Sequence, residues 1–237
     1  MKRKAIMLAC AAVVAACLLA LALLVGPYLK AEHEIDSLRS ACIVQADGAE
    51  HPDVDWEQLQ QVNPAVCAWV VVPGTNVSYP IVASPSSEPD YYIDHSIYQE
   101  HSVEGTPYLD VHCAADWSSP LSAVYGHHLI NQGMFSAFGS YSNEDFFAEH
   151  RTILLLTPQE NLTLDVVAAN IVDADYERLT LQFEDRAAFL AEWQRMVRES
   201  EVVAEDCPQE PEQAFCFSTC TYESSNARTL TLAVVRS

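Results

Sequence analysis

The feature that most constrains this chain is an uninterrupted apolar run close to its N-terminus. Residues 5–25 carry no charged or strongly polar side chain over 21 positions, and residues 26–29 extend the run to Leu29. At about 1.5 Å per residue, a helix of this length spans the roughly 30 Å hydrocarbon layer of a bilayer. Cleavable signal peptides carry a shorter apolar region, of about 7–15 residues, before a site of small residues. We therefore expect an uncleaved transmembrane anchor over residues 5–29.

Basic residues gather before the apolar run and acidic residues after it. Lys2, Arg3 and Lys4 precede the run, whereas the chain beyond Lys30 holds eight arginines against 33 acids, a net charge of −25. By the positive-inside rule, residues 1–4 are expected in the cytoplasm and the rest outside the cell. Such an acidic surface repels nucleic acid and anionic lipid headgroups, which bind through Lys and Arg. We expect an N-terminal helical segment over residues 30–60 and one main domain over residues 61–237.

Short β-strands dominate the pattern of the main domain. Before it, we expect a helix over residues 31–45 and a second helix that Asp53 or Asp55 caps and Asn63-Pro64 closes. Helices are also expected at residues 143–150 and 186–200, and the acidic stretch 199–213 is expected to be a long loop. Many short strands with few helices indicate a β-dominated barrel or sandwich. The apolar runs predict strands at residues 68–72, 77–82, 106–111, 122–125, 152–157, 162–172, 214–219 and 229–235.

A cysteine lies where the penultimate predicted strand ends. The sequence alternates between apolar and small residues up to Cys220, and polar residues follow at 221–226. A strand end holds a nucleophile rigidly yet leaves it accessible. Arg228 begins the next strand, so a hairpin would return its guanidinium to Cys220, where a cation lowers the pKa of a thiol or donates to an oxyanion. A buried, purely structural cysteine is the alternative.

His127 differs from the other histidines because it follows a predicted strand and Gly126. A cysteine, a histidine and an arginine at neighbouring strand ends would supply a nucleophile, a proton carrier and an oxyanion donor. A metal site is not favoured, because the spacing of His95, His101, His112 and Cys113 matches no known ligand pattern. Sequence alone leaves the disulfide pairing of the remaining cysteines open, namely Cys42, Cys67, Cys113, Cys207 and Cys216.

In their order along the chain, these motifs resemble the class B sortases, cysteine transpeptidases of the Gram-positive cell surface. The resemblance runs from about residue 59 to residue 235. The helix expected near residues 183–200 falls where class B members insert one between their sixth and seventh strands. The matching segments are Asn63-Pro64, Trp69, residues 73–82, residues 90–95, Tyr125-Gly126-His127, residues 133–135, Ser218-Thr219-Cys220 and Asn226-Ala227-Arg228.

The resemblance implies an eight-stranded β-barrel over residues 61–237, with N-terminal helices and a membrane anchor. It implies a transpeptidase that cleaves a C-terminal sorting signal after Thr, forms a thioester and transfers the surface protein to an amine of the cell-wall precursor. Cys220 would be the nucleophile, His127 the general acid and base, and Arg228 the oxyanion donor. The next residue, His128, is a second candidate for the histidine. The family usually has Asn at that position, and the first histidine of the pair is the one that aligns. Ser218 and Ile93 match positions that line the substrate groove, and the chemistry requires no cofactor.

Several alternatives stay open. The acceptor could be a Lys amine of a pilin, water could resolve the thioester in a hydrolase, or the barrel could be a non-catalytic peptide-binding module. Pro89 stands where many class B members have an Asn that contacts substrate, and a proline offers no N–H donor there. The recognised sorting motif is therefore left open.

Overall fold

The structure is a computed structural model that describes residues 2–44, 48–49, 51–129, 131–173, 179–220 and 227–236. The description of Cys220 is limited to its backbone. The polar segment 221–226, which the sequence analysis placed after the candidate nucleophile, lies outside the described residues.

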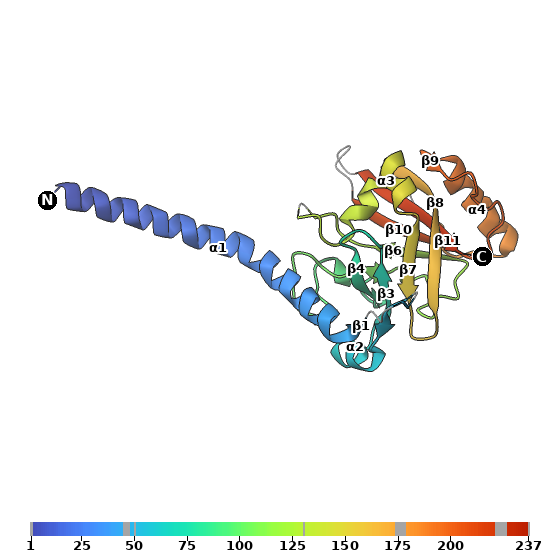
Figure 1. Ribbon diagram of the computed structural model, residues 1–237, viewed down its shortest axis with the longest axis horizontal. Coiled ribbons are helices and arrows are strands. Elements are labelled where there is room, and N and C mark those ends of the chain that lie inside the picture. Colours follow the sequence, from blue (N-terminus) through green and yellow to red (C-terminus); the bar gives the residue numbers. More distant parts are fainter. Residues whose placement is uncertain are drawn as a thin grey trace.

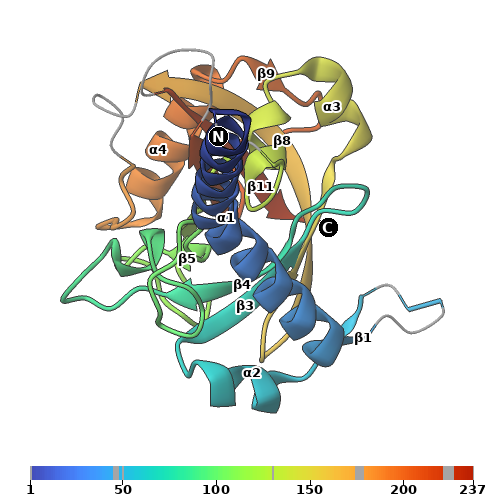
Figure 2. The ribbon, with the colours of Figure 1, turned by 90° about the vertical axis from the view of Figure 1, so that its left-hand side faces the viewer.

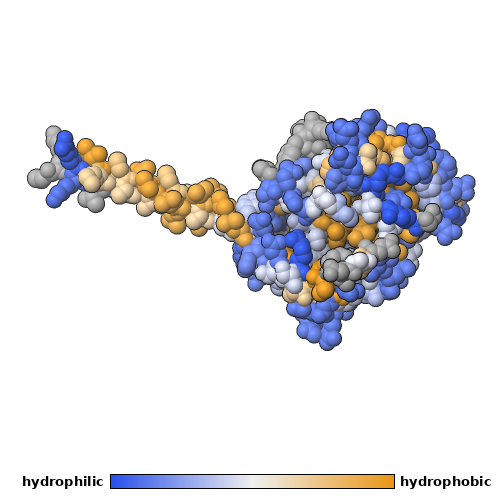
Figure 3. Space-filling model, viewed as in Figure 1, coloured by the Kyte–Doolittle hydropathy of each residue, from blue (hydrophilic) through white to orange (hydrophobic). Residues whose placement is uncertain are grey.

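A single long helix, α1 (Lys2–Cys42), contains the apolar run and the segment after it. Most of this helix stands away from the rest of the molecule (Figure 1), and apolar side chains are exposed along it, in contrast to the hydrophilic surface of the domain (Figure 3). By length and composition, α1 is a helix able to cross a membrane, a property that anchors and signal sequences share.

The last turns of α1 pack against the domain. Ala31, Ile35, Leu38 and Cys42 are buried and recur at the spacing of one helix face. These turns cross strand β4 (Ser78–Ala83; Figure 2), where the Arg39 guanidinium donates to the Ser78 carbonyl at 3.0 Å. An anchor over residues 5–29 and a separate helix over residues 31–45 were expected here, but α1 is one continuous helix from Lys2 to Cys42, with Pro27 inside it. A proline inside a helix removes one hydrogen bond and crowds the carbonyl four residues earlier, and a helix accommodates both by bending.

A small helical unit follows α1. Strands β1 (Ile43–Val44) and β2 (Asp53–Val54) form an antiparallel pair that the sequence analysis did not predict. Helix α2 (Trp56–Val62) begins after Asp55, whose side chain accepts from the Gln58 N–H at 2.9 Å, and ends at Asn63. The second predicted helix is thus confirmed, with Asp55 rather than Asp53 as its cap.

Eight strands form a closed barrel, as the sequence analysis expected. The order around the barrel is β3-β4-β5-β6-β10-β11-β8-β7, and the β8–β11 and β7–β3 pairings close the ring. The pairs β4–β5 and β6–β10 are parallel, and the other neighbours are antiparallel. The barrel strands are β3 (Val66–Val71), β4 (Ser78–Ala83), β5 (Tyr108–Leu109), β6 (Leu121–Tyr125), β7 (Thr152–Leu156), β8 (Asn161–Asp173), β10 (Ala214–Cys220) and β11 (Ala227–Val235).

The strand β9 (Val202–Val203) lies within the stretch that was expected to be a loop. It pairs with Ala168 and Ala169 of β8, and the flanking N–H groups of Glu201 and Ala204 also donate to β8. The prediction of a long loop over residues 199–213 is therefore wrong at Val202 and Val203. Two strand residues in an acidic segment give no alternating pattern that sequence analysis could detect.

The barrel is filled inside and covered on one outer side. Aromatic residues, among them Phe135, Phe138, Phe215 and Phe217, fill the interior with η2 (Ser136–Ser140) and α3 (Glu144–Glu149) beside them. Helix α4 (Arg186–Arg198) comes after the sixth barrel strand and before the seventh. It buries Phe189, Trp193 and Met196 against the outward-facing side chains of β8, β10 and β11.

Candidate active site

Three strand ends meet at one end of the barrel. The parallel pair β6–β10 sets Tyr125 opposite Ser218, and the Gly126 N–H donates to the Ser218 carbonyl at 3.1 Å. His127 follows directly, so its backbone runs beside the end of β10. On the other side of β10, the antiparallel register pairs Cys220 with Arg228. The backbone of Cys220 therefore ends a strand whose two neighbours carry His127 and Arg228.

A pocket of about 60 Å³ opens at these strand ends. Of the residues singled out from the sequence, Ile93, His127, Ser218 and Arg228 line it, and Cys220 follows the lining residue Thr219 in the chain. Ser218 is buried, whereas His127 and Arg228 are half-buried and Ile93 is exposed. The lining residues are Tyr92, Ile93, Thr106, Tyr108, Tyr125, Gly126, His127, Ser218, Thr219 and Arg228.

The imidazole of His127 is held by a main-chain carbonyl. Its Nε2 lies 2.7 Å from the carbonyl oxygen of Ile93, which ends the 3-10 turn η1 (Tyr91–Ile93). The His127 carbonyl in turn accepts from the Phe135 N–H at 3.0 Å. A Cβ at Gly126 would lie 2.6 Å from the Phe135 ring, so only glycine allows this close approach. His128 pairs with Met134 and is not among the described lining residues of the pocket.

Two tyrosines form the side of the pocket near Arg228. The rings of Tyr108 and Tyr125 are 5.4 Å apart, and their hydroxyls donate to Asp90 and Asp110, each at 3.2 Å. Burial raises the pKa of both phenols, and the neighbouring carboxylates add to the effect. Both hydroxyls therefore stay protonated as donors. Sequence reasoning did not single out either ring as a site residue, although Tyr125 directly precedes Gly126-His127.

The other candidate ligands and thiols lie apart from this pocket. His95 and His101 face each other across a β-bridge, with their Nδ1 atoms 2.7 Å and 3.8 Å from the Asp94 carboxylate. In the described part of the chain, no group of three or more His, Cys, Asp or Glu residues is arranged to hold a metal ion. Four of the cysteines whose pairing was left open are free thiols, namely Cys42, Cys67, Cys113 and Cys207.

Comparison with known proteins relates both the sequence and the fold to sortases, although no family model matches the chain. Sortase B of Listeria monocytogenes is 22% identical over 165 residues, 70% of this chain and 66% of that protein. Sortase B of Staphylococcus aureus is 24% identical over 153 residues, 62% of this chain and 60% of that protein. The match thus spans slightly less than two thirds of either relative.

Solved structures extend the comparison to the fold. Sortase B of Clostridium perfringens superposes with a TM-score of 0.70 at 22% identity, covering 76% of this chain and 99% of that one. A Bacillus anthracis protein described as similar to sortase B gives a TM-score of 0.76 at 20% identity, covering 89% of this chain and 98% of that one. The fold is therefore that of the sortase barrel. In sequence, the chain is similar to the class B sortases over 62–70% of its length.

Proposed function

We propose that this protein is a membrane-anchored cysteine transpeptidase of the sortase type. Homology to class B sortases supports the reaction class. The observation that carries the residue assignment is the meeting of strand ends at one pocket, with Cys220 opposite Arg228 and with His127 beside the end of β10. A nucleophile, a proton carrier and a fixed cation on adjacent strands are the components that acyl transfer through a thioester requires.

In the proposed reaction, the Cys220 thiolate attacks the carbonyl carbon of a Thr residue in a C-terminal sorting signal. Arg228 donates hydrogen bonds to the oxyanion that forms, and protonated His127 gives its proton to the leaving amine as the C–N bond breaks. An acceptor amine then attacks the thioester, His127 takes the proton that this amine loses, and the thiolate of Cys220 leaves. The net result exchanges one amine for another on the Thr carbonyl.

The proposed substrates are surface proteins that carry a C-terminal sorting signal, and the proposed acceptor is an amine of the cell-wall precursor. Ser218 and Ile93, which line the pocket, are proposed to contact the signal peptide. The half-buried Arg228 and the protonated hydroxyls of Tyr108 and Tyr125 give this pocket a polar side, and Ile93 gives it an apolar one.

The proposed topology puts residues 1–4 in the cytoplasm, residues 5–29 in the membrane and the domain outside the cell. Within that domain, residues 30–60 form the helical segment and residues 61–237 form the catalytic barrel. The exposed apolar side chains along the first part of α1 and the basic residues that precede them support this arrangement.

The test uses the full chain in detergent micelles, incubated with a set of Thr-containing sorting peptides and an amine acceptor. Mass spectrometry of protein and products should detect an acyl adduct on Cys220 and an amine-exchanged peptide, and Cys220→Ala should give neither. Cleaved peptide without exchange would indicate that water resolves the thioester. Bound peptide without any adduct would overturn the proposal in favour of a peptide-binding module.

A further inference from the structure

The tautomer of His127 follows from its contact with the main chain. A carbonyl oxygen can only accept a hydrogen bond, so the 2.7 Å contact between Nε2 and the Ile93 oxygen requires the hydrogen on Nε2. In the neutral ring, Nδ1 is then the nitrogen without a hydrogen, and it is the atom that can take up or release a proton. The position of the Ile93 carbonyl thus determines which ring nitrogen of His127 exchanges protons.

The turn at Glu104 and Gly105 lies directly against the Ile93 carbonyl. Gly105 adopts a φ of +62°, and a Cβ built on it would lie 2.4 Å from the Ile93 oxygen. The next residue, Thr106, donates its N–H to the Tyr92 carbonyl at 2.9 Å and its hydroxyl to the His95 carbonyl at 3.0 Å. The segment that leaves this turn is therefore hydrogen-bonded to carbonyls on both sides of Ile93, and there is no room at residue 105 for any side chain.

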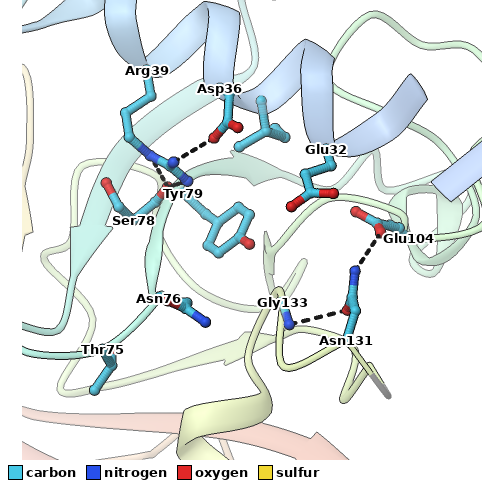
Figure 4. Close-up of a pocket in the computed structure, with 11 residues that line it drawn as sticks. Glu32, Asp36, Arg39, Thr75, Asn76, Ser78, Tyr79, Glu104, Asn131 and Gly133 are labelled. Carbon is cyan, nitrogen blue, oxygen red and sulfur yellow. Dashed lines mark hydrogen bonds and ion pairs between the residues drawn. The ribbon is translucent and has the colours of Figure 1, made fainter. Parts of the chain in front are cut away.

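Glu104 connects the same turn to the loop that carries His127. Its side chain is almost fully buried, and its Oε1 accepts from the Asn131 Nδ2 at 3.4 Å. Asn131 belongs to the loop between His127 and Phe135, and its Oδ1 accepts from the Gly133 N–H at 3.1 Å. Figure 4 shows these side chains at the edge of a cavity between α1 and the barrel, with Glu104 and Asn131 facing each other.

We propose that the turn Glu104–Gly105 positions His127 by holding the Ile93 carbonyl against Nε2, which leaves Nδ1 as the proton-exchanging atom. Gly105 is a positioning residue because the absence of a side chain lets the two chain segments meet. Glu104 is a positioning residue because its carboxyl group joins that turn to the His127 loop. The catalytic part of this inference rests on the proposed function, whereas the tautomer of His127 does not.

The test compares Gly105→Ala with Gly48→Ala in the full chain in micelles. Gly48 also has a positive φ, +76°, but a Cβ there would meet nothing within 4 Å, so it controls for backbone strain alone. In the wild type, the ¹⁵N shifts of neutral His127, assigned with His127→Gln, should report hydrogen on Nε2. Gly105→Ala should give a mixture of tautomers and lower kcat for thioester formation by about 10- to 100-fold with KM nearly unchanged, because misalignment loses part of the roughly 10²- to 10⁴-fold that general acid–base catalysis contributes. Gly48→Ala should change neither.

Glu104→Ala and Glu104→Gln provide a second, milder comparison in case Gly105→Ala does not fold. Glutamine keeps an acceptor oxygen for Asn131, so it should retain the wild-type tautomer and kcat, whereas alanine should lose part of both. The proposal is overturned if wild-type His127 carries its hydrogen on Nδ1, or if folded Gly105→Ala and Glu104→Ala proteins keep the wild-type tautomer. A tautomer that responds as expected in a protein without turnover would support the positioning and count against the proposed function alone.

Discussion

In the proposed reaction, even the conservative replacement of Arg228 by lysine should impair catalysis. It stands half-buried in the pocket, where the hydroxyls of Tyr108 and Tyr125 are already committed to Asp90 and Asp110. Lysine would keep the charge but not the planar set of N–H donors. Arg228→Lys should therefore lower kcat by about 10²- to 10³-fold, the effect of losing an oxyanion donor, with little change in KM. Steady-state kinetics check this.

Arg198→Lys is the matched control for that variant. Arg198 is exposed at the end of α4, so the same exchange there should leave both kinetic constants unchanged. Wild-type kcat in Arg228→Lys would remove the arginine from the proposed mechanism.

Three free thiols of the domain, Cys67, Cys113 and Cys207, lie in surroundings that suppress the nucleophilic thiolate form. Burial raises the pKa of Cys67 to about 12 and the pKa values of Cys113 and Cys207 to about 11. Because the thiolate is the reactive form, and it is scarce far below the pKa, an alkylating reagent at pH 8 should spare all three in the folded protein and modify them in urea. Peptide mapping by mass spectrometry measures this. Rapid alkylation of Cys67 in the folded protein would contradict the expectation.

Glu104 is a carboxyl group whose ionised form the fold disfavours. Burial, and secondarily the charge of Glu32, raise its pKa above the ordinary value of 4.5. A raised folded-state pKa means that stability is lost as the pH rises from the unfolded pKa through the folded one. Glu104→Gln removes that loss, so its melting temperature should exceed the wild type at pH 7, and the gain should disappear near pH 4. Thermal melts across this pH range test the sign.

At the scale of elements, the sequence was informative wherever a repeating pattern exists. Each predicted barrel strand has a counterpart because alternation along β10 and β11, for example, marks one face toward the interior and one toward α4. The two-residue strands β1, β2 and β9 were missed because so short a strand has no period. The continuity of α1 was missed because the composition changes at Lys30 from apolar to charged residues, which placed a boundary between two expected elements there.

In the candidate site, too, some residues could be predicted from the sequence and others could not. Cys220, His127 and Arg228 could be singled out because each stands where an alternating segment ends, and the structure brings their backbones to neighbouring strands. The partner of His127 could not be found from sequence, since it is a main-chain carbonyl of Ile93. Gly105 belongs to a loop without periodicity, and its role depends on a segment twelve residues earlier folding back onto it.

The cap of α4 provides a test of how this helix is held. Asp185 accepts from the Ala188 N–H at 2.8 Å at the start of α4. Asp185→Ala leaves that donor without its partner and should lower the free energy of unfolding by about 1 kcal/mol. Chemical denaturation measures the change. Its neighbour Glu184 is exposed, so Glu184→Ala is the control and should leave stability within about 0.5 kcal/mol of the wild type.

For the molecule as a whole, charge is the dominant surface property. Beyond Lys30 the chain has eight arginines against 33 acids. Such a field attracts cationic molecules over distances that salt shortens, since the Debye length falls from about 10 Å at 0.1 M to about 3 Å at 1 M. The kcat/KM for a lysine-rich acceptor peptide should therefore fall several-fold over that range, whereas a neutral acceptor of equal length should change little. Equal salt dependence for both would rule out electrostatic steering.

Because α1 is one continuous helix, it sets the distance between the pocket and the membrane in the proposed topology. Its final turns are joined to the barrel by the buried Ile35 and Leu38, and Lys30 forms an ion pair with Glu100 at 2.9 Å. From Lys30 to Cys42 the helix rises about 18 Å. In the proposed topology, the domain then has no slack linker on which to swing, and the pocket stays at one height above the bilayer. Sorting signals would be selected by the distance between their cleavage site and their own membrane segment as well as by their motif.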